Sequence, residues 1–470
     1  MHTIEQIFIN GEFVTPHGTE RFDLYNPATA QVIGQVRLAD EVDAARAVAA
    51  AKAAFPAWSQ TTKQERIAAL KRMHAAVAAR HDDLLEAVIE EYGAPASRSA
   101  WMASYPAEVI AQAIEALEEF EFVTPAGAAT VQMTPLGVAG LITPWNSDAG
   151  FICGKLAAAL AAGCTAVIKP SEMSALQTQI VTEALRDAAL PPGVFNIVTG
   201  RGETVGDTIS RHPDVAKISF TGSTHTGKAI LRNAAESFKR VTLELGGKSP
   251  TILLDDVDLA QAIPLVIQAG FMNSGQACVA GTRILVPYSR KAEIETALAQ
   301  AVAAVNSGDP RDKSTDVGPM VSAKQWQRVQ GYIRKGVEEG ARLLAGGEGR
   351  PEGTQDGWFV RPTLFADVNN QMTIARDEIF GPVLCVIPYR DEAEAIAIAN
   401  DTDYGLSAVV LGGADRARRV AQQIVSGRVL VNTLAHEPKA PFGGFKHSGV
   451  GREMGEWGIR AFMEPRSVLG

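Results

Sequence analysis

Two short segments of the chain could together carry covalent carbonyl chemistry. Cys278 lies in a stretch of small residues, 271–283, and Glu244 ends a strand-like run that continues into Gly246 and Gly247. A thiolate can attack a carbonyl carbon, and a nearby carboxylate can manage protons and activate water. Alone, a cysteine is usually a small core residue and a glutamate before two glycines a strand end. The two together predict a nucleophile and a base.

The three other cysteines have the surroundings of buried structural residues. Cys153 and Cys164 lie in an apolar helix and at a strand start, and Cys385 lies inside a predicted strand. A free cysteine in such places behaves as a small apolar side chain. No CxxC pair and no cysteine–histidine spacing indicates a metal site. Cys278 is therefore the candidate nucleophile, and we expect no metal.

Strand and helix patterns alternate through most of the chain. The first series has strands at 138–143, 165–169, 194–198, 217–220 and 240–245, with helices at 149–161, 174–189, 203–211 and 225–236. A second series follows, with strands at 251–254, 283–286, 383–388, 407–411 and 428–431 and helices at 258–270, 290–305, 322–339, 391–400 and 414–425. Helices at 41–55, 63–91 and 106–122 precede both. This alternation predicts an α/β protein with two doubly wound parallel sheets.

Polar and glycine residues gather where the strands of the first series end. Ligands bind parallel sheets outside the carboxyl ends of the strands. The segment 200–206 has the spacing GxGxxxG, one residue longer than the dinucleotide fingerprint GxGxxG. Gly222 and Ser223, at the start of a helix, are better candidates for binding a pyrophosphate, because a helix start offers free N–H groups. A plain strand-to-helix turn is the alternative for Gly222.

Seven ordered motifs resemble those of the aldehyde dehydrogenase superfamily, from about Phe8 to about Arg466. They are Asn26–Thr29, Thr143–Asn146, Lys169–Glu172, Phe220–Thr224, Glu244–Lys248 with the segment 271–283, Glu378–Pro382 and Pro441–Lys446. The resemblance implies an NAD(P)-dependent, hydrolytic, non-acylating enzyme. It also implies a Rossmann-like cofactor domain (1–120 and 136–245), a catalytic domain (246–445) and a small β oligomerisation element (121–135 and 446–470). We therefore expect a homodimer or homotetramer.

The resemblance assigns roles to four catalytic residues. Cys278 attacks the aldehyde, and the side chain of Asn146 with the Cys278 N–H holds the oxyanion of the thiohemiacetal. After hydride transfer to the nicotinamide, Glu244 activates the water that hydrolyses the thioester. Lys155 supports the site from the helix after Asn146, although a surface lysine is the alternative reading. An N-cap neighbour is the alternative for Asn146.

The resemblance likewise implies a cofactor site. Its expected members are Thr143, Trp145, Lys169, Ser171, Glu172, Gly202, Gly206, Phe220, Gly222, Ser223, Leu245, Gly246, Glu378 and Phe380. Lys169 and Glu172 would bind the adenosine ribose, where a carboxylate accepts hydrogen bonds from the 2′-hydroxyl and repels a 2′-phosphate. This favours NAD, with NADP still open. Ordinary core packing is the alternative for Phe380.

The expected substrate tunnel departs from the family pattern. Its members would be Ser147, Gly150, Phe151, Gly154, Ala277 and Val279. Many relatives carry an aromatic residue and proline where this chain has Ser147 and Asp148. The small residues Ser147, Gly150 and Gly154 predict a roomy, more polar entrance, so we expect a bulky or aromatic aldehyde. Asp148 either favours a basic or hydroxylated group or caps the helix. Arg283 is the only arginine near Cys278 in sequence, so no anchor for a carboxylate-bearing semialdehyde is evident.

Composition narrows the remaining classes. The net charge of −9 argues against nucleic-acid and anionic-membrane partners, and no apolar run is long enough to span a bilayer. The start of the chain lacks the pattern of a secretory signal, so we expect a cytoplasmic enzyme. Two alternatives stay open. One is an acylating relative using coenzyme A, against which Glu244 argues. The other is a cysteine hydrolase, which would need His436 or His447 as partner.

Overall fold

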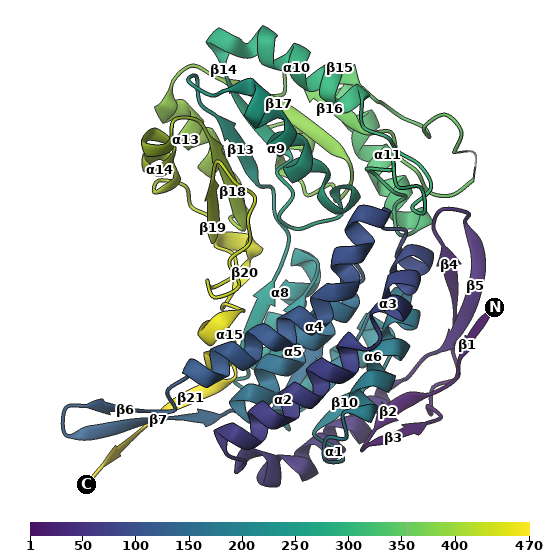
Figure 1. Ribbon diagram of the computed structural model, residues 1–470, viewed down its shortest axis with the longest axis vertical. Coiled ribbons are helices and arrows are strands. Elements are labelled where there is room, and N and C mark those ends of the chain that lie inside the picture. Colours follow the sequence, from purple (N-terminus) through teal and green to yellow (C-terminus); the bar gives the residue numbers. More distant parts are fainter. Residues whose placement is uncertain (355) are drawn as a thin grey trace.

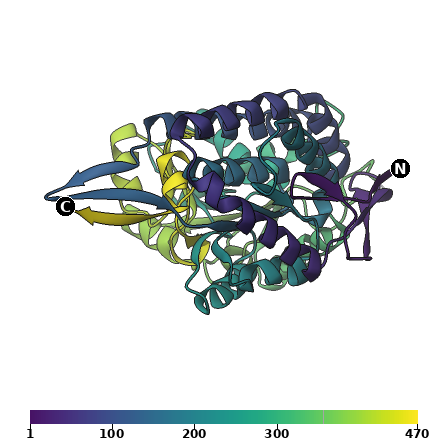
Figure 2. The same cartoon turned by 90° about the horizontal axis from the view of Figure 1, so that it is seen from below.

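Two sheets of mostly parallel strands form the centres of two lobes, and a three-stranded arm projects from the lower one (Figures 1 and 2). This computed structural model describes residues 1–354 and 356–470, apart from the side chain of Ser97. The predicted α/β class with two doubly wound sheets and a small β element is confirmed, with antiparallel strands at sheet edges as an addition.

The lower lobe contains an eight-stranded sheet whose five central strands are parallel. In spatial order the strands are β20 (Gly449–Val450), β12 (Arg240–Glu244), β11 (Val215–Thr221), β8 (Val138–Ile142), β9 (Thr165–Lys169), β10 (Phe195–Ile197), β2 (Ile7–Ile9) and β3 (Glu12–Val14). The strands β8 and β9 are buried along their whole length, as expected of strands covered on both faces. The strand order reverses between β8 and β11, which places a crevice at their carboxyl ends.

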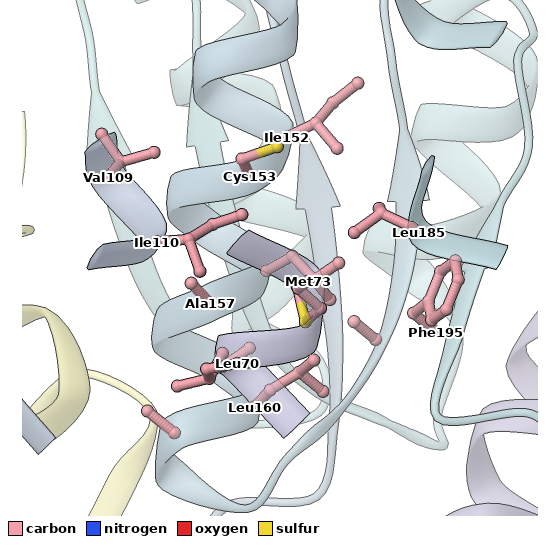
Figure 3. Packing of buried hydrophobic residues seen from close by; sticks show 14 of the residues in the cluster. Leu70, Met73, Val109, Ile110, Ile152, Cys153, Ala157, Leu160, Leu185 and Phe195 are labelled. Carbon is pink, nitrogen blue, oxygen red and sulfur yellow. The ribbon is translucent and has the colours of Figure 1, made fainter. Parts of the chain in front are cut away.

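Helices cover both faces of this sheet. They are α1 (Glu41–Ser59), α2 (Lys63–Ala78), α3 (His81–Ala87), α4 (Ala96–Glu119), α5 (Asp148–Ala162), α6 (Ala175–Asp187), α7 (Asp207–Arg211) and α8 (Thr224–Ala235). The helix α5 is apolar on almost every side and packs among α2, α4 and α6. Figure 3 shows Leu70 and Met73 of α2 against Leu160 of α5 and Phe195 of β10. This core fixes the crevice end of α5.

The upper lobe contains a seven-stranded sheet, parallel except at one edge. Its order is β15 (Arg342–Ala345), β16 (Thr363–Ala366), β17 (Val383–Tyr389), β14 (Arg283–Pro287), β13 (Pro250–Leu253), β18 (Ser407–Leu411) and β19 (Arg428–Val431). Its helices are α9 (Leu259–Phe271), α10 (Lys291–Ala303), α11 (Ala323–Glu338), α12 (Thr373–Arg376), α13 (Glu392–Asn400) and α14 (Ala414–Ala421). The chain crosses from the lower lobe directly between β12 and β13.

Two smaller sheets complete the fold. The arm consists of β6 (Val123–Ala126), β7 (Ala129–Pro135) and β21 (Met463–Leu469), and the helix α15 (Gly455–Arg460) leads into β21. Near the N-terminus, β1 (His2–Ile4), β5 (Gln31–Arg37) and β4 (Arg21–Asn26) form a separate sheet. Strands β1–β5, β15, β16 and β20 were not predicted. They are short or carry no regular alternation of apolar residues.

Two predicted helices differ from the observed bounds more than the others do. The helix predicted at 63–91 breaks after Ala78 and ends in a π-helical turn, Val88–Tyr92. Neither glycine nor proline marks the break, where Arg80 forms ion pairs with Asp83 and Glu183. The helix predicted at 106–122 begins at Ala96, so Pro106 lies inside it rather than at its start.

The segment 446–470, predicted as part of an oligomerisation and bridging element, contributes strands to two sheets. β20 pairs with β12 and extends the eight-stranded sheet, whereas β21 pairs with β7 in the arm. None of the described helices combines the length and apolar character needed to cross a bilayer.

The core in Figure 3 generates a stability prediction. Met73→Ala should lower the free energy of unfolding by about 2–5 kcal/mol, because Met73 is fully buried and its truncation leaves a cavity. Thermal unfolding followed by circular dichroism would measure this as a lower midpoint. Lys71→Ala, two residues away on the exposed face of α2, is the matched control and should change stability by less than about 0.5 kcal/mol. Equal midpoints for both variants would contradict this account of the core.

Candidate active site

A cavity of about 400 Å³ is lined by residues of both lobes. It brings together every predicted catalytic and substrate residue, namely Cys278, Glu244, Asn146, Lys155, Ser147, Gly150, Phe151, Gly154, Ala277 and Val279. These residues come from the carboxyl ends of β8 and β12, from α5 and from the loop after α9. A thiol, a carboxylate and an amide therefore face one enclosed volume.

The loop that carries Cys278 turns sharply after α9. Asn273, Ser274 and Gly275 all have left-handed backbones, with φ of 54°, 58° and 74°. A β-carbon at position 275 would lie 2.2 Å from the backbone of Gly381, so only glycine fits there. The turn reverses the chain and presents Cys278, the one cysteine that is not fully buried, to the cavity.

Hydrogen bonds fasten this loop to the loop after β8. The Asn146 amide nitrogen donates to the carbonyl of Gln276 at 3.0 Å, and the Asn273 amide donates to the carbonyl of Asn146 at 3.1 Å. The Gln276 side chain in turn accepts from the Val321 N–H at 3.0 Å. The amide of Asn146 is thus bonded to residue 276, which precedes Cys278 by two positions in the same loop. An amide N–H at this place can bind an oxyanion.

The segment that connects β12 to β13, residues 245–249, passes in contact with the backbone of Cys278. A β-carbon at Gly247 would lie 2.3 Å from the carbonyl oxygen of Cys278, and one at Gly246 would lie 2.5 Å from Glu378. The Glu378 carboxylate accepts the Gly247 N–H at 3.0 Å, and burial raises its pKa to about 7. The two glycines therefore allow the crossing to pass between Cys278 and Glu378.

Glu244 is a buried carboxylate with no neutralising partner. Its side chain is 3% exposed, and neither oxygen has a hydrogen-bond partner among the described residues. Burial, and then the charge of Glu453, raise its pKa well above the usual value. Such a group can take a proton from a thiol or a water, which is the behaviour of a general base.

A second carboxylate near Glu244 is neutralised. Lys155, itself buried, forms an ion pair with Glu453 and donates to the Ser219 hydroxyl at 2.9 Å. Ser219 also donates to Glu453 at 2.9 Å. The alternative reading of Lys155 as a surface lysine is wrong. Glu453 was missed because it lies in the C-terminal segment, distant in sequence from every residue it meets.

The thiol of Cys278 is held mostly protonated in this arrangement. Burial raises its pKa to about 12, the charges of Glu378 and Glu244 act in the same direction, and Arg428 acts against them. Only the thiolate is a strong nucleophile, so the thiol must lose its proton when it reacts. No hydrogen bond joins Cys278 to His436 or His447 in the part of the chain that the structure describes.

Predicted ribose-binding residues lie at the carboxyl end of β9. The Lys169 ammonium is 3.1 Å from one Glu172 oxygen, and the other lies 3.4 Å from Arg201. Burial raises the pKa of Glu172, but the charge of Lys169 and the local hydrogen bonds outweigh it and leave the pKa below the usual value. The Ser171 hydroxyl oxygen accepts a hydrogen bond from the Met173 N–H at 3.3 Å. An ionised carboxylate of this kind accepts hydrogen bonds from vicinal hydroxyls.

The two glycine segments differ in how they could receive phosphate. Ser223 caps α8 by accepting the Thr226 N–H at 3.2 Å, and a β-carbon at Gly222 would collide with the ring of Phe220 at 2.5 Å. The segment Gly202–Gly206 forms a π-helical turn rather than the start of a regular helix at 203. A β-carbon at Gly202 would meet nothing within 4 Å, so space remains beside this turn.

Two aromatic residues of the predicted cofactor site, Trp145 and Phe380, are in contact with each other. The rings of Trp145 and Phe380 meet edge to face at 5.4 Å, and Phe380 has a strained φ of 61°. The Thr143 hydroxyl donates to Asp148, and the Leu245 N–H donates to the carbonyl of Ser448. Both of these donors are used within the protein. Lys169, Glu172 and Glu378 are therefore the ionic groups of the predicted set that could bind a dinucleotide, and the Gly247 N–H holds Glu378 beside the segment that passes Cys278.

Asp148 lies in the first turn of α5, as a residue that complements the helix dipole does, but it makes no capping hydrogen bond and is not in the cavity lining. Its side chain is fully buried, points away from the cavity and accepts from the hydroxyls of Thr143 at 2.6 Å and Thr178 at 2.8 Å. The space expected beside Gly150 is filled, because a β-carbon there would lie 2.6 Å from the ring of Tyr105.

The sequence beside Cys278 shows no arginine other than Arg283, and the arginines that line the cavity come from distant segments. Arg283 lies under the sheet, fully buried and bonded to four acceptors, and does not line the cavity. Arg98, Arg428 and Arg452 line it instead. Their positions in α4, in β19 and near the C-terminus give no local signal of this convergence.

Comparison with known proteins agrees with this geometry. Residues 13–468 match the profile of the aldehyde dehydrogenase family. The chain is 44% identical to a 3-succinoylsemialdehyde-pyridine dehydrogenase of a Pseudomonas species, covering 100% of this chain and 99% of the relative. A mutant aldehyde dehydrogenase C from Pseudomonas syringae, solved with NAD+ and octanal, has a TM-score of 0.98 and 43% identity, covering 100% and 97% of the two chains. An aldehyde dehydrogenase of Mycobacterium tuberculosis complexed with NAD+ has a TM-score of 0.96 at 41% identity, covering 99% and 98%.

The electrostatics of the thiol generate a prediction about its reactivity. Alkylation of Cys278 by iodoacetamide should accelerate about tenfold per pH unit from pH 7 to pH 10, because a raised pKa keeps the thiolate scarce. Glu244→Gln should speed alkylation at pH 8 by removing a nearby negative charge. Peptide mass spectrometry would follow the adduct, with Glu348→Gln on the surface as control. A rate that is flat above pH 8 in the unaltered protein would contradict the assignment.

Proposed function

The chain belongs to the aldehyde dehydrogenase family, as an enzyme that oxidises aldehydes with NAD+, and from this premise we propose how its residues do so. The observation that carries the proposal is the shared cavity of Cys278, Glu244 and Asn146. Cys278 is the nucleophile, Glu244 is the base and Asn146 is the oxyanion donor. The reaction consumes one aldehyde, one water and one NAD+ and yields a carboxylic acid, NADH and a proton.

The first step forms a bond between sulfur and carbon. The Cys278 thiol gives up its proton to Glu244, an unpartnered base that lines the same cavity, and adds to the carbonyl carbon. The amide of Asn146 and the N–H of Cys278 bind the resulting oxyanion, each worth about 3 kcal/mol in the transition state. The hydrogen bond from Asn146 to Gln276 keeps that amide close to the sulfur.

The second step releases the acid. The carbon attached to Cys278 would lose a hydride to the nicotinamide, which supplies the oxidation when it is bound, and would become the carbonyl of a thioester on Cys278. Glu244 then removes a proton from water, and the hydroxide attacks the thioester and frees the Cys278 thiolate. Its raised pKa suits this task, because a base with a pKa nearer neutrality binds the proton more strongly.

Ionic groups at the cofactor crevice support NAD+ over NADP+. The Glu172 carboxylate is positioned by Lys169 and ionised, so it accepts from ribose hydroxyls and repels a 2′-phosphate. Glu378 and Phe380 would lie at the nicotinamide end. The domain bounds at 120, 136, 245 and 445 remain part of this proposal.

The competing functions have less support. An acylating enzyme would pass the thioester to coenzyme A and would not need the unpartnered base at 244. A cysteine hydrolase would need a histidine bonded to the thiol, and His436, although it lines the cavity, makes no such bond among the described residues. A bulky or aromatic aldehyde agrees with the rings of Trp101, Tyr105 and Phe151 in the lining.

Assembly and compartment are part of the same proposal. Five of the seven residues of β21, from Pro465 to Leu469, are exposed, and the arm has two free edges in the described chain. Unpaired strand edges seek partners, so we expect a homodimer or homotetramer formed through the arm. A cytoplasmic location suits a catalytic thiol and four free cysteines.

Glu244→Gln should separate the two chemical steps. With benzaldehyde and NAD+ the variant should release about one NADH per active site and then slow by about 10²–10⁴-fold, because thioester hydrolysis has lost its base. Stopped-flow absorbance at 340 nm would measure both phases, without added coenzyme A. Glu338→Gln, on the exposed face of α11, is the control. Continued turnover at the unaltered rate would exclude Glu244 as the hydrolytic base.

Glu172→Gln should weaken the discrimination between cofactors. The neutral amide no longer repels a 2′-phosphate, so kcat/KM with NADP+ should rise about tenfold relative to NAD+. The nearby exposed Glu203→Gln should leave the ratio unchanged. If both variants keep the original ratio of kcat/KM for NADP+ to that for NAD+, Glu172 does not contact the 2′ position of the ribose.

A further inference from the structure

The cavity around Cys278 contains more positive than negative charge. Among the described residues, its lining has four cationic side chains, Arg98, Lys155, Arg428 and Arg452, and two carboxylates, Glu244 and Glu453. Lys155 is paired with Glu453. Arg452 donates to two backbone carbonyls, of Gly444 at 3.1 Å and of Gly451 at 2.7 Å. Arg98 and Arg428 remain without an anionic partner in this part of the structure.

Arg98 is the more unusual of these two. Its Nε is buried without a hydrogen-bond acceptor, and its guanidinium lies over the ring of Trp101 at 3.8 Å. Burial lowers its pKa, with the nearby phenols of Tyr92 and Tyr105 acting in the other direction. A guanidinium taken out of water without an acceptor is costly, so this position needs an explanation.

Structural arginines elsewhere in the chain are bonded differently. Arg283 donates to the carbonyls of Lys248, Ile398 and Ala399 and to the side chain of Asn370, and Arg66 donates to Thr61, Ser59 and Ala161. Buried arginines that serve packing in this protein are therefore surrounded by oxygen acceptors. Arg98 faces a cavity without one, which indicates that its acceptor comes from outside the chain.

Arg428 shares this property from the opposite lobe. Its one side-chain hydrogen bond goes from Nε to the Ser407 hydroxyl at 3.3 Å, and no carboxylate pairs with it in the described structure. Burial lowers its pKa, and the charge of Cys278 acts in the opposite direction. Arg428 is thus close enough to the thiol to influence it, and its terminal nitrogens have no acceptor.

Aromatic rings form the wall between the arginine of α4 and the thiol. Arg98, Trp101 and Tyr105 are spaced by three and four residues, so they share one face of α4. Trp101 and Tyr105 stack at 4.3 Å with an interplanar angle of 24°. Phe151 of α5 adds a further ring to the lining. Such a wall suits a flat, conjugated body better than a branched aliphatic one.

Resting on the proposed function, we propose that the substrate is an aldehyde with a flat unsaturated or aromatic body and a carboxylate, which Arg98 and Arg428 bind. The carboxylate supplies the acceptors that both guanidiniums lack, and a planar fork matches it in two hydrogen bonds. The product is then a dicarboxylate.

The test compares charged aldehydes with neutral aldehydes of the same shape. We would measure kcat/KM with NAD+ for 3- and 4-carboxybenzaldehyde and for the corresponding hydroxymethylbenzaldehydes. The unaltered enzyme should prefer at least one acid over its neutral counterpart by about 100-fold. Arg98→Met and Arg428→Met should each reduce that ratio about tenfold, and Arg418→Met, on the exposed surface of α14, should leave it unchanged.

The outcomes separate the two proposals. If the unaltered enzyme oxidises the neutral aldehydes as well as or better than both acids, or if neither arginine variant changes the ratio, the carboxylate anchor is wrong and the proposed function stands. If no aldehyde yields NADH, both are wrong. Should the variants fail to fold, inhibition of the unaltered enzyme by terephthalate but not by its neutral diamide supports the anchor, and equal inhibition overturns it.

Discussion

The crossing from β12 to β13 passes so close to the Cys278 loop that no side chain fits between them. A β-carbon at Gly247 would lie 2.3 Å from the Cys278 carbonyl. Glu244 lies at the start of this crossing, so the base, the thiol and Glu378 are positioned by one short segment. The lobes thereby share a cavity whose walls come from both sheets, and the remainder of the site depends on that contact.

The second constraint is that two glutamates of the cavity differ in their bonding partners. Glu453 is neutralised by Lys155 and bonded to Ser219, whereas Glu244 has no partner among the described residues. In a region of low dielectric an unpaired carboxylate is unstable as an anion, so Glu244 binds a proton more readily than the paired Glu453 does. The same absence of partners at Arg98 indicates a ligand rather than a fault of packing. Unpaired groups in this cavity thus mark where reactants enter.

The local pattern of apolar and polar residues predicted where the strands end, but it did not predict contacts between residues that are distant in the sequence. Lys169 ends the apolar strand β9, Glu172 follows three residues later, and Glu244 ends β12, in which Val241 and Leu243 alternate with Thr242. Such strand patterns end where a buried parallel strand leaves the sheet. Cys278 was predicted to be the nucleophile because the residues next to it in the sequence are small. The break in the helix after Ala78 carries no glycine or proline, and ion pairs with residues from another helix accompany it.

The errors at the substrate end have a common physical cause. Gly150 suggested open space, but the ring of Tyr105 fills it, and Asp148 resembled a cap but is bonded inside the fold by two threonines. Arg98, Arg428 and Glu453 reach the cavity from α4, β19 and the C-terminal segment. Side chains that meet only after the two lobes and the C-terminal segment pack leave no periodic signal in any one segment.

The covalent bond at Cys278 is the central claim, and trapping it tests the account most directly. The enzyme would be mixed with benzaldehyde and NAD+, quenched in acid within milliseconds and digested for peptide mass spectrometry. We predict a benzoyl thioester, 104 Da heavier by the arithmetic of replacing a thiol hydrogen with C7H5O (about 105 less 1), on Cys278 alone. An unmodified Cys278 during steady NADH production, or an acyl group on another residue, would contradict the account.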